Sequence, residues 1–132
     1  MDDIIIIGGG IIGASTAYFL AKEGRKVKVI ERDPTYKNAS FPLSLGGFRR
    51  QFFQKENILL GKFARDFIFQ IPELLKTEKN PNPTASMVTN GYLLMFGPEH
   101  AEEQYKALEN HKACEAGTKN IKGSELTKYF PY

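Results

Sequence analysis

Four consecutive isoleucines, Ile4–Ile7, open the hydrophobic pattern of the chain, and no polar residue alternates with them. Such a short run of β-branched residues is typical of a strand that is buried on both faces of a parallel sheet. Three glycines follow directly, and the apolar positions from Ile12 to Ala21 predict a helix that Gly24 ends. A second strand over Val27–Ile30 completes one βαβ unit with a right-handed crossover.

The pattern then predicts a loop, a helix and a hairpin. Residues 32–47 contain scattered proline, serine and glycine and are typical of an irregular loop. Apolar positions at spacings of three and four between Leu60 and Ile71 predict an amphipathic helix that Pro72 ends or kinks. Asn90-Gly91 predicts the turn of a β-hairpin over residues 87–96, because this pair supports the positive φ angles of a type I′ turn.

Two more helices are expected toward the C-terminus. Pro98 suits the first turn of a helix that runs to about Ala116, with Gly117 as its stop. Ser124 is placed to cap a last short helix before Pro131.

The composition is that of an ordinary globular protein, and it argues against several classes of function. Of the 132 residues, 42% are hydrophobic and 25% are charged. The net charge of +3 is too small and too scattered to indicate nucleic-acid binding. No apolar stretch approaches the roughly 20 residues of a membrane span. The acidic Asp2 and Asp3 oppose a signal peptide, and a single cysteine, Cys114, forms no internal disulfide, so we expect a cytoplasmic protein.

The glycines form the pattern Gly8-x-Gly10-x-x-Gly13 between the first strand and the first helix. Gly8 allows a tight turn, Gly10 lets a pyrophosphate approach the backbone, and Gly13 lets the helix pack closely on the strand. Free N–H groups and the positive end of the helix dipole favour phosphate there. Glu31 ends the second strand, where an acidic residue accepts hydrogen bonds from an adenosine ribose. The pattern predicts a dinucleotide site and leaves NAD and FAD open; a glycine-rich turn beside a solvated Glu31 is the alternative.

Several stretches resemble the D-amino-acid oxidase family of FAD-dependent oxidoreductases, which includes sarcosine oxidases, sarcosine dehydrogenases and glycine oxidase. Residues 3–13 and 29–32 resemble its N-terminus, and residues 43–52 with 56–58 are similar to its loop under the flavin. Residues 90–93 and 125–131 resemble a hairpin and a later helix-and-proline signature of its substrate domain. The resemblance implies an α/β fold: a Rossmann-like βαβ unit of a doubly wound FAD-binding domain, followed by helices and a β-hairpin of an incomplete substrate domain.

The resemblance also implies roles for individual residues. The FAD pyrophosphate would be held by the glycines and one backbone N–H, which are Gly8, Gly10, Ile12 and Gly13. Glu31 would bind the adenosine ribose, Arg32 would lie beside the adenine, and Ser40 would meet the pyrophosphate. Gly46 and Gly47 would pass close to the isoalloxazine ring.

The resemblance further implies that Arg49 pairs with a substrate carboxylate through its guanidinium fork. The alternative is that Arg49 and Arg50 are solvated loop arginines. The resemblance implies hydride transfer from the carbon next to the nitrogen of a small amine or amino acid to flavin N5. No catalytic residue is assigned.

The other candidate groups carry no predicted chemistry. His100 and His111 lie 11 residues apart on a polar helix, so we expect solvated side chains and no metal site. Cys114 has no activating neighbour and is expected to be inert. We expect three phenylalanines of the long helix to be core residues: Phe63, Phe67 and Phe69.

Members of the family are considerably longer, so the chain resembles their N-terminal third. We expect residues 1–80 to form the FAD-binding unit with its flavin loop and helix, and residues 81–132 to begin a truncated substrate domain. Two strands and one helix leave an apolar sheet face uncovered. We therefore expect no catalysis by this chain alone, and either a partner chain or self-association. A non-catalytic dinucleotide-binding fragment or subunit and an NAD(P)-binding protein are the alternatives.

Overall fold

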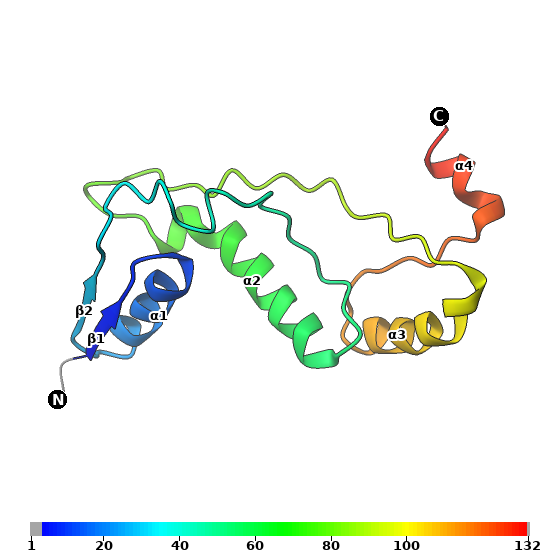
Figure 1. Ribbon diagram of the computed structural model, residues 1–132, viewed down its shortest axis with the longest axis horizontal. Coiled ribbons are helices and arrows are strands. Elements are labelled where there is room, and N and C mark those ends of the chain that lie inside the picture. The colour runs from blue at the N-terminus through cyan, green and yellow to red at the C-terminus, as the bar shows by residue number, and fades with distance from the viewer. Residues whose placement is uncertain (1–3, 132) are drawn as a thin grey trace. The chain divides into compact units, whose positions relative to one another are not determined.

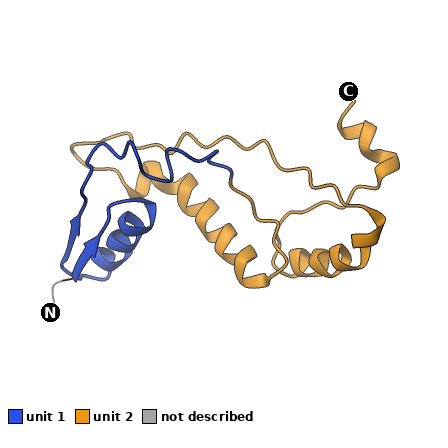
Figure 2. Cartoon of the chain, viewed as in Figure 1, with its two compact units in different colours: residues 1–47 blue, residues 48–132 orange. Residues whose placement is uncertain are grey.

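The computed structural model describes residues 4–131, and these fall into two compact units (Figure 1; Figure 2). Unit 1 extends to Gly47 and unit 2 begins at Phe48. The predicted boundary at residue 80 divides the chain by function, into a cofactor-binding part and a substrate-binding part. That boundary stays a prediction.

Unit 1 is the βαβ unit that the hydrophobic pattern predicts. Strand β1 (Ile4–Ile7), helix α1 (Ile11–Lys22) and strand β2 (Val27–Ile30) follow one another, and the two strands are parallel, with Ile4 opposite Val27. Helix α1 packs on both strands (Figure 1). The order and type of all three elements are confirmed.

The two faces of this small sheet differ in exposure. Ile4 and Ile6 are half-buried, whereas Ile5 and Ile7 are exposed, Ile7 to 88%. The expectation of a strand buried on both faces is therefore wrong for the chain by itself. The reason is physical: one helix covers one face only, and a two-stranded sheet has a second apolar face that needs another layer.

Unit 2 opens with a longer helix than the spacing predicted. Helix α2 (Lys55–Leu74) continues through Pro72, which neither begins nor ends it. The Leu75 N–H donates to the Ile71 carbonyl at 3.0 Å, so the last turn closes without the donor that proline lacks. Pro72 therefore does not end the helix, which continues two residues further to Leu74, and the alternative of a kink at Pro72 stays a prediction.

The C-terminal helices are shorter than predicted. A 3-10 turn, η1 (Pro98–His100), leads into α3 (Ala101–Ala113), and a second turn, η2 (Gly123–Glu125), leads into α4 (Leu126–Tyr129). Helix α3 ends before Ala116 because Glu115 adopts a left-handed backbone, with φ of 52°. Ser124 lies inside η2 and makes no capping hydrogen bond, so its predicted role is wrong.

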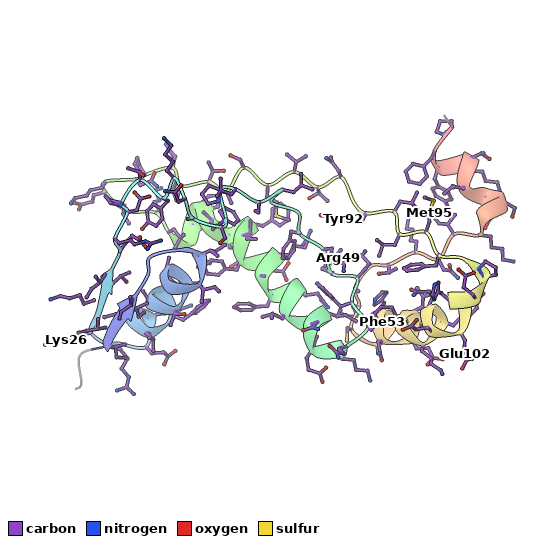
Figure 3. All side chains as sticks on the ribbon, in the orientation of Figure 1. Lys26, Arg49, Phe53, Tyr92, Met95 and Glu102 are labelled. Atoms are coloured by element: carbon purple, nitrogen blue, oxygen red, sulfur yellow. The ribbon has the colours of Figure 1, made fainter. Side chains whose placement is uncertain are left out.

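The predicted hairpin is absent from the described residues. Residues 87–96 run extended, and no backbone hydrogen bond joins them to any described residue. Gly91 has a φ of 78°, but Asn90 does not share a positive φ, and a type I′ turn needs both. Tyr92 and Met95 are carried along this segment, and both are exposed (Figure 3).

The core of unit 2 is small and joins the start of α2 to the end of α3. Ile58, Cys114 and Ala116 are buried there, and Phe52 packs against them. Lys62 Nζ donates to the Cys114 carbonyl at 2.7 Å across the same contact.

His111 belongs to this core, contrary to the expectation of a solvated side chain. It is 8% exposed, and its Nε2 lies 2.7 Å from the Phe52 carbonyl oxygen. His100, by contrast, is exposed as expected. Within residues 4–131 no three His, Cys, Asp or Glu side chains gather in a way that would hold a metal ion.

Two of the three phenylalanines of α2 are exposed, contrary to the core position that the spacing predicted, whereas Phe67 is half-buried. Phe63 stacks on Phe67 with ring centroids 6.4 Å apart, yet Phe63 stays 55% exposed. Phe69 is also exposed and lies under the Arg65 guanidinium.

None of the described helices combines the length and apolarity that crossing a lipid bilayer requires.

Candidate dinucleotide-binding site

The turn between β1 and α1 is built on two glycines that touch. Gly8 has a φ of 99°, and its N–H donates to the Ile30 carbonyl of β2 at 2.8 Å. A Cβ on Gly13 would collide with the Gly8 carbonyl oxygen and would lie 3.3 Å from Ile6 Cγ2. Any side chain at Gly13 would therefore push α1 away from β1, which explains the glycine there.

Gly10 differs from these two because it faces open space. It precedes α1 in an extended conformation, and a Cβ built on it would meet no atom within 4 Å. The first helical hydrogen bond runs from Ala14 N–H to the Gly10 carbonyl, so the N–H groups of Ile11, Ile12 and Gly13 have no acceptor inside the helix. No acidic residue lies in this first turn. The helix end suits a phosphate.

Glu31 links the second strand back to the glycine turn. Its Oε2 accepts the Gly9 N–H at 2.6 Å, and its Oε1 accepts the Asp33 N–H at 2.9 Å. These hydrogen bonds, that from Asp33 first and that from Gly9 next, lower the pKa of Glu31 below its ordinary value of 4.5. The carboxylate is therefore ionised at neutral pH, and each oxygen keeps a lone pair for a further donor.

The loop after Glu31 is ordered by a short turn that sequence reasoning missed. Asp33 Oδ1 accepts the Thr35 hydroxyl at 2.6 Å and the Thr35 N–H at 3.0 Å. The Thr35 hydroxyl is the main cause that lowers the pKa of Asp33. The signal was present in Asp33-Pro34-Thr35, because an Asx turn of this kind is typical of that composition.

The structure therefore brings Gly8, Gly10, Gly13 and Glu31 together at one end of the parallel pair, as the motif predicts. Of the other candidates of unit 1, Arg32 contacts this cluster through its backbone, whose hydrogen bond also lowers the pKa of Glu31. The Arg32 side chain is exposed and acts on Asp33 through its charge. Ser40 makes no hydrogen bond to any described residue, and the N–H of Gly46 donates to Ser44 Oγ at 3.2 Å. The roles of Arg32, Ser40, Gly46 and Gly47 stay predictions.

Arg49 is described within unit 2. Its guanidinium carbon lies 5.2 Å from the centre of the Phe52 ring, which is a cation–π contact. The side chain is exposed, whereas Arg50 is half-buried and its Nη2 would be 3.4 Å from a Cβ on Gly117. Arg50 is only half-buried, so the alternative of two solvated loop arginines and the substrate role of Arg49 both stay predictions.

A parallel strand pair, a glycine turn and an acidic residue at the end of the second strand define a dinucleotide-binding unit. The profile of the family described as "FAD dependent oxidoreductase" matches residues 3–132. The chain belongs to this family of FAD-dependent oxidoreductases, whose domain is an FAD-binding Rossmann-like fold.

Two relatives that match almost the whole chain share one name. The chain is 38% identical to "FAD-dependent oxidoreductase domain-containing protein 1" of Xenopus laevis, over 98% of the chain and 27% of the relative. It is 33% identical to the protein of the same name in Bos taurus, over 98% of the chain and 28% of the relative. The chain thus spans about a quarter of the length of these relatives.

Other similarities are short. "Squalene monooxygenase SE2" of Panax ginseng is 62% identical over 34 residues, which are 26% of the chain and 6% of that protein. No solved structure matches the chain.

The residues of the site fit FAD as a ligand. The open space beside Gly10 leaves room for a pyrophosphate against the backbone, and the first turn of α1 offers unpaired N–H groups. The ionised Glu31 offers acceptors to a ribose.

Proposed function

We propose that this chain is the adenosine-diphosphate-binding part of an FAD-dependent oxidoreductase that oxidises the C–N bond of a small amine or amino acid. The family is FAD-dependent, which favours FAD over NAD(P) for a site that both cofactors could enter. The observation that carries the proposal is the ionised Glu31, bonded to the Gly9 N–H beside the open space at Gly10.

Each group of the site has a definite role in this proposal. The N–H groups at the start of α1 bind the pyrophosphate, and Gly10 leaves it room. Glu31 accepts hydrogen bonds from the adenosine ribose, and the Gly9 and Asp33 N–H groups keep its carboxylate in place. Bound FAD supplies the hydride acceptor for the oxidation. The exposed guanidinium of Arg49 pairs with the carboxylate of an amino-acid substrate.

Equilibrium dialysis of the 132-residue chain against FAD, ADP and NAD tests the cofactor. We expect FAD and ADP to bind, and Glu31→Ala to raise both dissociation constants by about tenfold or more, because charge-assisted hydrogen bonds are lost. Glu23→Ala is the matched control, since Glu23 is an exposed carboxylate at the other end of α1. Tighter binding of NAD than of FAD, or equal affinities for wild type and Glu31→Ala, would contradict the proposal.

The same proposal holds that this chain alone does not turn over substrate. Catalysis needs the flavin held against the substrate in a site that excludes water, and proximity supplies up to about 11 kcal/mol of the barrier. The exposed glycine loop around Gly46 and the exposed Arg49 form no enclosure within either unit. Anaerobic mixing of chain, FAD and a panel of free and N-methyl amino acids should leave the flavin absorbance unchanged. Bleaching that depends on the amino acid would overturn this part.

A second chain covers the exposed sheet face in this proposal. Ile5, Ile7 and Ile30 are exposed in the parallel pair, and the relatives are almost four times as long as this chain. The second chain is either another copy or a chain that carries the remaining family sequence. Light scattering on the purified chain should give a mass above 14.9 kDa, and Ile7→Thr should lower it. A monomer at every concentration would exclude self-association.

A further inference from the structure

Tyr36 differs from the rest of unit 1 because its backbone is left-handed at a bulky residue. Its φ is 55°, a region that bulky side chains seldom adopt. The surrounding loop holds it there: the Tyr36 N–H donates to the Asp33 carbonyl, and the Tyr36 carbonyl accepts the Ala39 N–H, both at 3.0 Å. A fold that maintains such a conformation at a bulky residue directs the side chain to a place that ordinary backbone would not reach.

That place is the corner where Gly9 meets Glu31. A Cβ built on Gly9 would lie 2.7 Å from the Tyr36 hydroxyl oxygen, 3.3 Å from Glu31 Cβ and 3.5 Å from Glu31 Oε2. The phenol hydroxyl and the carboxylate therefore lie against the same side of Gly9. This also explains a glycine at a position where the dinucleotide motif accepts any residue.

The hydroxyl at this corner is available to a ligand. It makes no hydrogen bond to any residue of the described part of the chain, and Tyr36 is 39% exposed. Glu31 is ionised, so it can only accept hydrogen bonds, whereas a phenol can also donate one. A ribose hydroxyl that donates to Glu31 keeps lone pairs, and a donor beside the carboxylate satisfies one of them.

We infer that the Tyr36 hydroxyl is a second ribose-binding group of this site, which hydrogen-bonds the adenosine ribose alongside Glu31. The inference rests on the proposed function, because it needs an adenosine dinucleotide at the site. It also explains the left-handed backbone of Tyr36, because this backbone places a neutral donor, the phenol hydroxyl, next to the anionic acceptor Glu31.

The inference is tested with Tyr36→Phe, which removes the hydroxyl and keeps the ring. Calorimetric titration with ADP should show a dissociation constant about two- to tenfold higher than that of wild type, the usual worth of one neutral hydrogen bond. Tyr105→Phe, at an exposed tyrosine of α3, is the matched control and should leave the affinity unchanged. Near-ultraviolet circular dichroism checks that the variants keep their fold.

Deoxy analogues separate a direct contact from a structural one. Wild type should bind ADP more tightly than at least one of 2′-deoxy-ADP and 3′-deoxy-ADP, and Tyr36→Phe should shrink that ratio. A purely structural tyrosine would weaken all three ligands equally, which would overturn the inference. If Glu31→Ala loses affinity and Tyr36→Phe does not, the inference alone is wrong. If wild type binds no ADP, the proposed function is wrong as well.

Discussion

Two stretches of the molecule that contain glycine differ in their hydrogen bonds. One is the turn between β1 and α1, and the other is the extended segment 87–96. In the first, the Gly8 N–H is bonded to β2, and the Gly9 N–H is bonded to Glu31. In the second, Gly91 also has a positive φ, yet none of residues 87–96 has a backbone partner among the described residues. The turn is held because β2 and Glu31 lie beside it in the same βαβ unit, 22 residues further along the chain, whereas segment 87–96 has no such neighbour among the described residues. A glycine with a positive φ therefore fixes a turn here only where a neighbouring strand supplies hydrogen-bond partners.

The largest expected loss of stability comes from a side chain added at Gly13, where the turn brings α1 against β1. Gly13→Val places a Cβ on the Gly8 carbonyl, a backbone atom that cannot swing aside. We expect a loss of more than about 3 kcal/mol, enough to unfold unit 1, because overpacking forces α1 off β1. Urea unfolding followed by circular dichroism measures it. Gly10→Ala is the control, since its Cβ meets open space. Equal stabilities of the two variants would show that the contact between Gly13 and Gly8 does not exclude a side chain.

The next effect concerns the non-local core of unit 2. His111→Ala removes the ring nitrogen bonded to the Phe52 carbonyl and leaves a cavity. We expect a loss of about 2 to 4 kcal/mol, the sum of a buried unpaired carbonyl and lost packing. His100→Ala should change stability by less than about 0.5 kcal/mol, because His100 is exposed. Thermal unfolding of both variants gives the comparison, and two equal shifts would remove His111 from the core.

Acid should act on the turn through Glu31. Its pKa in the folded chain lies below 4.5, so its contribution to stability is full above pH 4.5 and is lost as pH falls through the folded-state pKa. We expect wild type to exceed Glu31→Gln by a constant margin near neutral pH and to approach it below pH 4.5. Urea midpoints at intervals of pH measure the margin. A margin that grows on acidification would have the wrong sign for an ionised, hydrogen-bonded carboxylate.

The smallest expected loss of stability is at Gly9, where the Tyr36 hydroxyl lies close to the backbone. Gly9→Ala brings a Cβ against the Tyr36 hydroxyl, which is the far end of a side chain and can move. We expect a stability loss below about 1 kcal/mol, and a smaller loss when Tyr36→Phe is already present. A double-mutant cycle on urea unfolding gives the coupling. Strict additivity of the two changes would show that the hydroxyl and Gly9 do not meet in solution.

The sequence predicted those parts whose causes are local. Gly8, Gly13 and Glu31 lie within 24 residues of one another, and their roles depend on atoms that the same short stretch supplies. Hydrophobic periodicity also placed α1 and β2 within a residue or two.

The sequence failed where the cause lay in distant partners or in an unusual backbone. The burial of His111 depends on the Phe52 carbonyl, 59 residues away, and polar neighbours on α3 gave no sign of it. Tyr36 was missed because left-handed backbone at a tyrosine has no compositional signal, although the Asx turn before it does. The hairpin was predicted from Asn90-Gly91 with its apolar flanks and from the resemblance of residues 90–93 to a family hairpin, but a turn dipeptide does not supply the hydrogen bonds between two strands.

The extended segment 87–96 has a consequence for the lifetime of the protein. A protease takes its substrate as an extended chain with unpaired N–H and C=O groups, and this segment offers that conformation without any unfolding step. Val88, Tyr92 and Met95 add exposed apolar side chains of the kind that cleft-binding proteases accept. We therefore expect limited proteolysis to cut first within residues 87–96, before either unit unfolds.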